Sequence, residues 1–206
     1  MYSKPVRISG LAAILGGIML IVHAVGVASM PRGCIGDAEC AIRPMRETGV
    51  FELFFLFALL LILAGMAGLA LRAWRTGRFG ALGWAGVILS AAGVATLVIA
   101  IVAQVALFGG DLSLMPFFAI SGGLALLAGF SLVGISVLRA GVLPRWMAAV
   151  LVASTLAMLG FNQENARVLI GIPFALAWMA VGYILWSGGS GAAHRPAPAK
   201  RMESVP

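Results

Sequence analysis

The stretch from Val50 to Leu71, VFELFFLFALLLILAGMAGLAL, decides the fold class of this chain. Glu52, near its start, is the one charged residue in an otherwise apolar run. A transmembrane helix needs about 20 consecutive apolar residues to cross a hydrocarbon core of about 30 Å. The stretch therefore predicts a helix that spans a bilayer.

The rest of the chain has the same character. Of its 206 residues, 62% are hydrophobic and 10% are charged, whereas about 25% of the residues of a soluble domain are charged. This composition excludes a soluble fold and predicts an all-α polytopic membrane helix bundle. The chain is long enough for six spans with short loops and has no room for a second folded domain.

Residues 1–187 are predicted to form one domain with six transmembrane helices. The fifth apolar run begins after Pro144 and is close to the lower limit of about 17 residues for a span. Residues 188–206 are rich in Gly, Pro, Ala and basic residues, so we expect a disordered basic cytoplasmic tail. The six predicted spans are Ile8 to Met30, Val50 to Leu71, Gly80 to Phe108, Leu114 to Leu138, Arg145 to Phe161, and Arg167 to Ser187.

Lysine and arginine set the predicted orientation, because the cytoplasmic loops of membrane proteins are enriched in them. With the N-terminus inside, ten of the 14 basic residues lie in cytoplasmic segments, and four lie outside: Arg32, Arg43, Arg46 and Arg167. Trp74, Trp84, Trp146 and Trp186 fall near the same inner boundaries, where an indole ring anchors a helix among headgroups. Both termini are therefore predicted to be cytoplasmic.

Strongly polar residues in or beside the spans gather towards the outer leaflet. Ionisable groups near hydrocarbon usually pair with each other or face a wet cavity. We therefore expect an outward-facing polar pocket, with Glu52 paired to Arg167 or to His23. The alternative is that these side chains simply reach the headgroups. The candidate ligand-binding residues are His23, Glu52, Gln104, Asn162 and Arg167.

Cys34 and Cys40, the two cysteines of the chain, lie in the first outer loop. An even count in an oxidising compartment favours a structural disulfide between them. The alternative is a redox-active thiol pair acting with a quinone. Membrane enzymes of that kind typically use Cys-x-x-Cys, whereas five residues separate this pair.

Small residues four positions apart occur in several predicted spans and allow helix backbones to approach closely. They either pack the bundle internally or form a face for a protein partner or a second copy of the chain. The candidates are Ala13 with Gly17, Ala64 with Gly68, Gly86 with Ser90, and Ala125 with Gly129.

No catalytic or metal-binding constellation is visible in the sequence. His23 and His194 are the two histidines, and they are predicted on opposite sides of the membrane. Zinc-protease, phosphate-loop and nucleophile-elbow motifs are absent. The basic residues flank apolar runs and do not form one polar face, so nucleic acid is not an expected partner. We expect no cofactor, no metal and no enzymatic activity.

Two segments carry a family resemblance: Gly141 to Trp146, GVLPRW, and Asn162 to Trp186, with Ile172-Pro173-Phe174 and Trp178 inside it. Together they resemble uncharacterised bacterial six-helix membrane proteins with a Leu-Pro-Arg-Trp turn and a Trp-containing last helix. The resemblance implies a bacterial cytoplasmic (inner) membrane and six spans, and it implies no reaction.

These features predict a non-enzymatic membrane protein that acts as an accessory subunit or binds lipid or another apolar ligand through its outer half. The alternative is a small transporter or the membrane substrate-binding subunit of an uptake system. Against the alternative, few polar side chains reach the midplane, where transported solutes usually bind.

Overall fold

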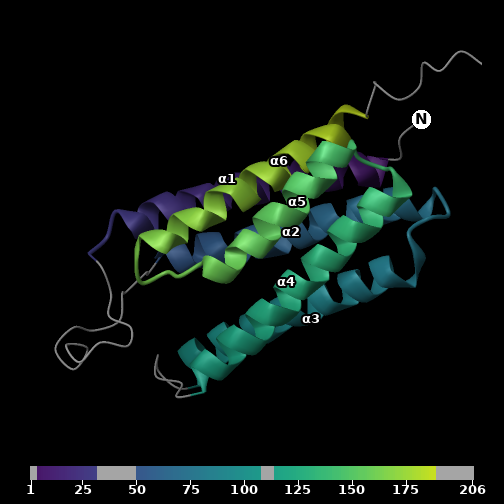
Figure 1. Cartoon of the computed structure of the whole chain (residues 1–206). Coiled ribbons are helices and arrows are strands. Elements are labelled where there is room, and N and C mark those ends of the chain that lie inside the picture. The colour runs from purple at the N-terminus through teal and green to yellow at the C-terminus, as the bar shows by residue number, and fades with distance from the viewer. Residues whose placement is uncertain (1–3, 32–49, 108–113, 189–206) are drawn as a thin grey trace, which may run out of the picture.

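The structure is a computed structural model that describes residues 4–31, 50–107 and 114–188, without the side chains of 104–106. Within these ranges all regular secondary structure is helical (Figure 1). The elements are α1 (Lys4–Ala28), α2 (Val50–Trp74), α3 (Gly80–Ala106), α4 (Met115–Ala140), α5 (Arg145–Ala157), the 3₁₀ turns η2 (Met158–Gly160) and η3 (Ala166–Ile170), and α6 (Gly171–Ser187).

Five of these helical segments are long and apolar enough to cross a membrane: α1, α2, α3, α4, and η3 together with α6. The sixth, α5 extended by η2, is apolar but shorter. The expected all-helical fold with apolar helices of membrane-spanning length is therefore confirmed for five segments, and the predicted fifth span is the shortest of the six. It begins at Arg145 as predicted, because Pro144 cannot continue a helix from its N-terminal side but is tolerated at a helix start.

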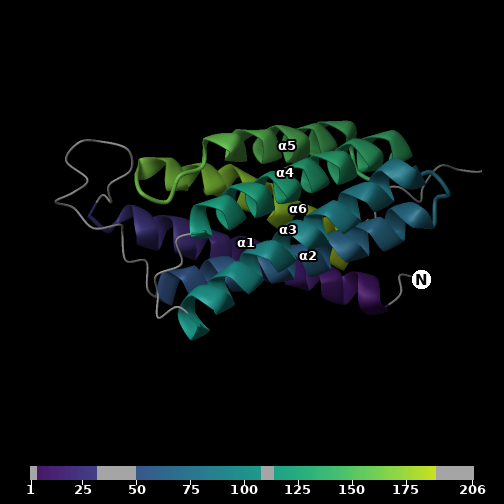
Figure 2. The same cartoon turned by 90° about the horizontal axis from the view of Figure 1, so that it is seen from below.

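The helices form two groups, which are joined by α5 and by contacts between α2 and α3. Helix α1 packs against both α2 and α6, while α3 packs chiefly against α4, and α5 bridges α4 to α6. Figure 1 shows the α3–α4 pair diverging from the other helices towards the end opposite to the N-terminus, and Figure 2 shows the same helices from below. The divergence places the two groups at an angle to each other.

The two ends of the bundle differ in charge. We call one the basic end: it holds the start of α1, the α2–α3 turn, the α4–α5 turn and the end of α6 (Figure 1). Exposed indoles also gather there, and the Arg7 Nε donates to the Trp186 carbonyl oxygen at 3.3 Å. The described basic residues of this end are Lys4, Arg7, Arg72, Arg75, Arg78, Arg139 and Arg145.

Glycines allow the closest helix contacts. A Cβ added to Gly86 would lie 2.8 Å from the carbonyl oxygen of Gly129, and one added to Gly17 would lie 2.8 Å from that of Ala175. Lipid is as apolar as leucine, so membrane helices associate through such close packing. These glycines belong to the predicted small-residue pairs. Those pairs therefore serve packing within the bundle.

An aromatic cluster joins the two groups near the middle of the bundle. The ring of Phe130, on α4, lies 5.4 Å from the ring of Phe174 and 5.3 Å from that of Trp178, both on α6. All three side chains are buried. Aromatic pairs at these distances stabilise a fold by about 0.5–1.5 kcal/mol beyond area burial. The cluster thus provides an apolar link between α4 and α6.

Two glycines test this packing. A Cβ on Gly93 would lie 2.6 Å from the Gly122 carbonyl oxygen and 2.7 Å from the Leu126 nitrogen, whereas one on Gly123 would meet nothing within 4 Å. Gly93→Ala should therefore force α3 from α4 and destabilise the fold by about 1–3 kcal/mol. Gly123→Ala should be neutral or stabilise it by about 0.5–1 kcal/mol, because alanine favours helix. Unfolding in SDS, followed by circular dichroism, measures both; equal effects would contradict the α3–α4 contact.

Candidate functional site

A cavity of about 550 Å³ opens between the two groups of helices, at the end of the bundle opposite to the basic end. We call it the pocket, and this end the pocket end. Residues of α2, α3 and α4 line it, together with η2, the turn after η2, Leu20 of α1 and Phe174 of α6. Small-molecule sites have volumes of roughly 300–1,000 Å³, so the pocket is large enough for a ligand.

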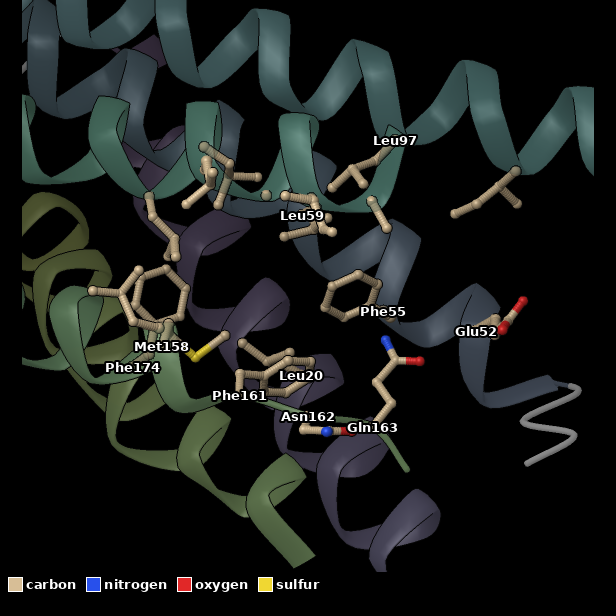
Figure 3. A pocket seen from close by; sticks show the side chains of 18 of the residues that line it. Leu20, Glu52, Phe55, Leu59, Leu97, Met158, Phe161, Asn162, Gln163 and Phe174 are labelled. Atoms are coloured by element: carbon tan, nitrogen blue, oxygen red, sulfur yellow. The ribbon is translucent and has the colours of Figure 1, made fainter. Parts of the chain in front are cut away.

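The lining of the pocket is apolar except along one edge. Figure 3 shows Phe174 and Met158 at one end of the pocket, while Glu52, Asn162 and Gln163 lie towards the other. These three are the polar residues of the lining. We call them the polar rim. Pockets that combine an apolar body with a few convergent polar groups bind amphiphilic or apolar ligands.

The pocket runs along α4 for a distance that matches a lipid chain. Its lining on α4 extends from Met115 to Leu127, which corresponds to about 18 Å at the helical rise of 1.5 Å per residue. One leaflet contributes about half of the hydrocarbon core of about 30 Å. The pocket is therefore about as long as one leaflet is deep.

The shortness of α5 opens the pocket sideways. Helix α4 is about 39 Å long. Helix α5 runs back alongside it and, with η2, ends at Gly160 after about 25 Å. The first turns of α4 therefore extend beyond the end of α5. Ile120, Leu124 and Leu159 line the pocket and are 63%, 55% and 63% exposed. The pocket wall thus continues into the exposed apolar surface of the helices.

His23 is buried behind the pocket and does not line it. Its side chain is 0% exposed, and Nδ1 lies 2.8 Å from the Phe51 carbonyl oxygen. A carbonyl oxygen can only accept, so Nδ1 donates. Nε2 is buried without a hydrogen-bond partner. The bond joins α1 to the first turn of α2, where Glu52 is located.

A run of rings connects His23 to the pocket wall. The imidazole lies 5.0 Å from the Phe55 ring, and that ring stacks on Phe161 at 6.1 Å with an interplanar angle of 12°. Phe55 and Phe161 both line the pocket. The Phe51 ring also packs directly over Gly26, so a Cβ at Gly26 would force the ring to move. His23 therefore positions pocket residues from outside the pocket.

The structure brings only some of the predicted site residues together. Glu52 and Asn162 lie on the polar rim. Arg167 is exposed on η3 and is not part of the lining; its backbone N–H donates to Asn165 Oδ1 at 2.8 Å. The side chain of Gln104 lies outside the described residues, although Ile101, one turn earlier on α3, lines the pocket.

Most of the lining was not predicted from the sequence. Gln163 was not among the predicted site residues, and the apolar residues of the lining were not predicted at all. Leucines and phenylalanines of the pocket have the same sequence context as those that face lipid, so no local pattern distinguishes them. The short fifth apolar run was the one available signal in the sequence. It predicts that a neighbouring helix extends past the end of the fifth, which leaves room for a pocket.

Cys34 and Cys40 lie outside the described residues, so the disulfide stays a prediction, as does the disordered tail from residue 189 onwards. Within the described ranges, no group of three or more His, Cys, Asp or Glu side chains is placed to hold a metal ion. The polar rim offers one carboxylate and two carboxamides, which bind by hydrogen bonds and charge.

Comparison with protein-family models, with curated proteins and with solved structures finds no match to this chain. The function is therefore argued from the pocket and its surroundings.

Replacing His23 tests whether it is structural. His23→Leu removes the hydrogen bond between α1 and α2 and should destabilise the protein by about 1 kcal/mol, the usual size of such bonds between membrane helices. His23→Gln, which can still donate, should lose less. Because His23 does not line the pocket, bound lipid should be retained. Thermal unfolding in detergent and native mass spectrometry measure the two effects. Unchanged stability with loss of lipid would instead assign His23 to the binding site.

Proposed function

We propose that this protein is a non-enzymatic membrane protein that binds a lipid or another long apolar ligand in the pocket. The observation that carries the proposal is a pocket that is apolar along its length, polar at one rim and continuous with the lipid-facing surface. A ligand that reaches such a site from the bilayer needs no aqueous path. The chain would then act as a lipid-binding protein or as the lipid-binding subunit of a larger membrane assembly.

The proposed topology has six spans, including the short α5–η2 segment, with both termini in the cytoplasm of a bacterial cell. The separation of charge supports it. The basic end carries seven described lysines and arginines, and cytoplasmic ends are enriched in these residues. At the pocket end, Arg167 is accompanied by Glu52 and Glu164. In this topology the pocket lies in the outer leaflet.

The geometry favours binding of an apolar chain over transport of a polar solute. Polar groups of the lining are confined to the rim, and the body of the pocket is formed by Leu, Ile, Met, Phe and Ala side chains. A polar solute placed there would lose its hydration without gaining hydrogen bonds, at a cost of about 1–3 kcal/mol or more for each unsatisfied group. An acyl chain avoids this cost, because it has no polar groups that would lose hydrogen bonds.

Gly123 offers a way to fill the pocket without disturbing the fold. It lines the pocket, and a Cβ there meets nothing within 4 Å. Gly123→Leu should reduce lipid retention about tenfold, since the leucine side chain occupies space that the bound chain needs, and such overpacking typically costs about 1–3 kcal/mol. Thermal stability should not fall. Native mass spectrometry of gently extracted protein measures the bound lipid.

Ala128→Leu is the matched control, because Ala128 is exposed on the same helix and is not part of the lining. It should retain lipid as the wild type does. Wild-type protein that is free of lipid after gentle extraction, or equal retention in the Gly123→Leu variant, would contradict the proposed function.

A further inference from the structure

The inner end of the pocket is closed by buried residues. One turn beyond the lining, towards the basic end, each of the six helices carries a buried residue that is not part of the lining. The large apolar side chains among them belong to one continuous core. We call these six residues the floor: Gly17, Ile62, Val94, Phe130, Thr155 and Trp178. The pocket therefore ends blindly inside the bundle.

Phe174 forms part of the wall at this inner end. Its ring lines the pocket and is 1% exposed, and Figure 3 places it at the end remote from Glu52. Two rings of the floor lie against it, with centroid distances of 5.4 Å to Phe130 and 6.4 Å to Trp178. Side chains packed at interior density leave no free space into which a ring could withdraw. Phe174 therefore sets a fixed limit to the depth of the pocket.

The length of the pocket limits the number of carbon atoms in a bound chain. Its lining on α4 extends over about 18 Å. A fully extended alkyl chain gains about 1.25 Å with each methylene group, from C–C bonds of about 1.5 Å at the tetrahedral angle. A straight chain of about 14 carbon atoms therefore extends along the whole lining, from Met115 to the inner end.

The width of the pocket limits the number of chains. A volume of about 550 Å³ over a length of about 18 Å corresponds to a mean cross-section of about 30 Å². A methylene group occupies roughly 27 Å³, slightly less than the roughly 30 Å³ of a water molecule in the liquid, so an extended chain has a cross-section of about 22 Å². One chain fits with some room to spare, and two chains side by side do not.

Building on the proposed function, we propose that the pocket seats one straight alkyl chain of about 14 carbon atoms, with its methyl end against Phe174. The exposed apolar residues Ile120, Leu124 and Leu159 leave the pocket open sideways, so a second chain of the same lipid can stay in the bilayer. The ligand is thus a single-chain amphiphile or one arm of a two-chain lipid. Phe174 is the residue that determines the length of the seated chain.

Straight-chain primary alcohols from octanol to icosanol test the length limit. Each displaces tritiated tetradecanol from the full-length protein in a non-ionic detergent, at equal mole fraction in the micelle. Specific binding is the part of the signal that is lost in the Gly123→Leu variant. Affinity should rise about two- to threefold with each added methylene group, because a shorter chain leaves part of the pocket empty. The rise should stop at about 14 carbon atoms, and one tracer molecule should bind per protein.

Phe174→Ala should move this limit by about two to four carbon atoms towards longer chains, because the space of the ring becomes available to the ligand. Phe174→Leu removes less of the side chain and should move the limit by about one or two carbon atoms. Phe117→Ala is the matched control, since Phe117 is exposed on α4 and is not part of the lining. It should leave the limit unchanged. If Phe174→Ala fails to fold, Phe174→Leu and the wild-type series decide.

Two further competitors distinguish the sources of the chain: monotetradecanoylglycerol and ditetradecanoylglycerol. Equal displacement of the tracer by both supports a two-chain lipid that seats one of its chains. Stronger displacement by the monoester supports a single-chain amphiphile. Tighter binding of the diester by about tenfold or more would overturn the single-chain seat, because the second chain would then fill the pocket as well. Two specifically bound tracer molecules per protein would overturn it too.

An affinity that keeps rising up to icosanol, or that does not depend on chain length, would overturn the length limit and leave the proposed function intact. An unchanged limit in folded Phe174→Ala protein would do the same, as would an equal shift in Phe117→Ala. Absence of tracer binding that is sensitive to Gly123→Leu would overturn the proposed function itself.

Discussion

Close contact between helix backbones is the interaction on which the rest of this structure depends. In a bilayer, helices gain nothing by exchanging lipid for leucine, so they associate where small residues let backbones meet. Gly86, Gly93 and Gly129 provide this contact between α3 and α4, and Gly10 and Gly17 provide it between α1 and α6. Each close pair forms a rigid unit. The angle between these units then decides where space remains.

The pocket lies where close packing stops. Helix α5 joins the α3–α4 pair to α6, but it ends with η2 at Gly160, short of the start of α4. Beyond that point none of the described helices fills the angle between the two groups. Gly123 faces this space: a Cβ there would meet nothing within 4 Å, whereas a Cβ on its neighbour Gly122 would lie 3.0 Å from Leu97 Cγ. These two adjacent glycines of α4 thus have opposite roles: Gly122 allows a close helix contact, and Gly123 leaves space in the pocket.

The sequence predicted the helices well, because breaks in apolar runs are marked by residues with strong local preferences. Pro144 and the basic turn after Trp74 place the starts of α5 and α3 correctly. It predicted the site less well. Glu52 and Asn162 share the polar rim because both lie at the same end of the bundle. His23, in contrast, lies behind the pocket wall. Which face of a helix points towards its neighbour depends on packing, and the sequence does not reveal that packing.

The depth of the polar rim connects the packing to the proposed ligand. Glu52 lies at the start of α2, and Asn162 and Gln163 follow the end of η2, so all three lie where helices begin or end. In the proposed topology such positions lie at the headgroup level, and the body of the pocket lies within the hydrocarbon. A bound amphiphile would keep the depth and orientation that it has in the leaflet. Because neither the chain nor the head changes its surroundings much on entry, affinity would depend mainly on how well the chain fits the shape of the pocket.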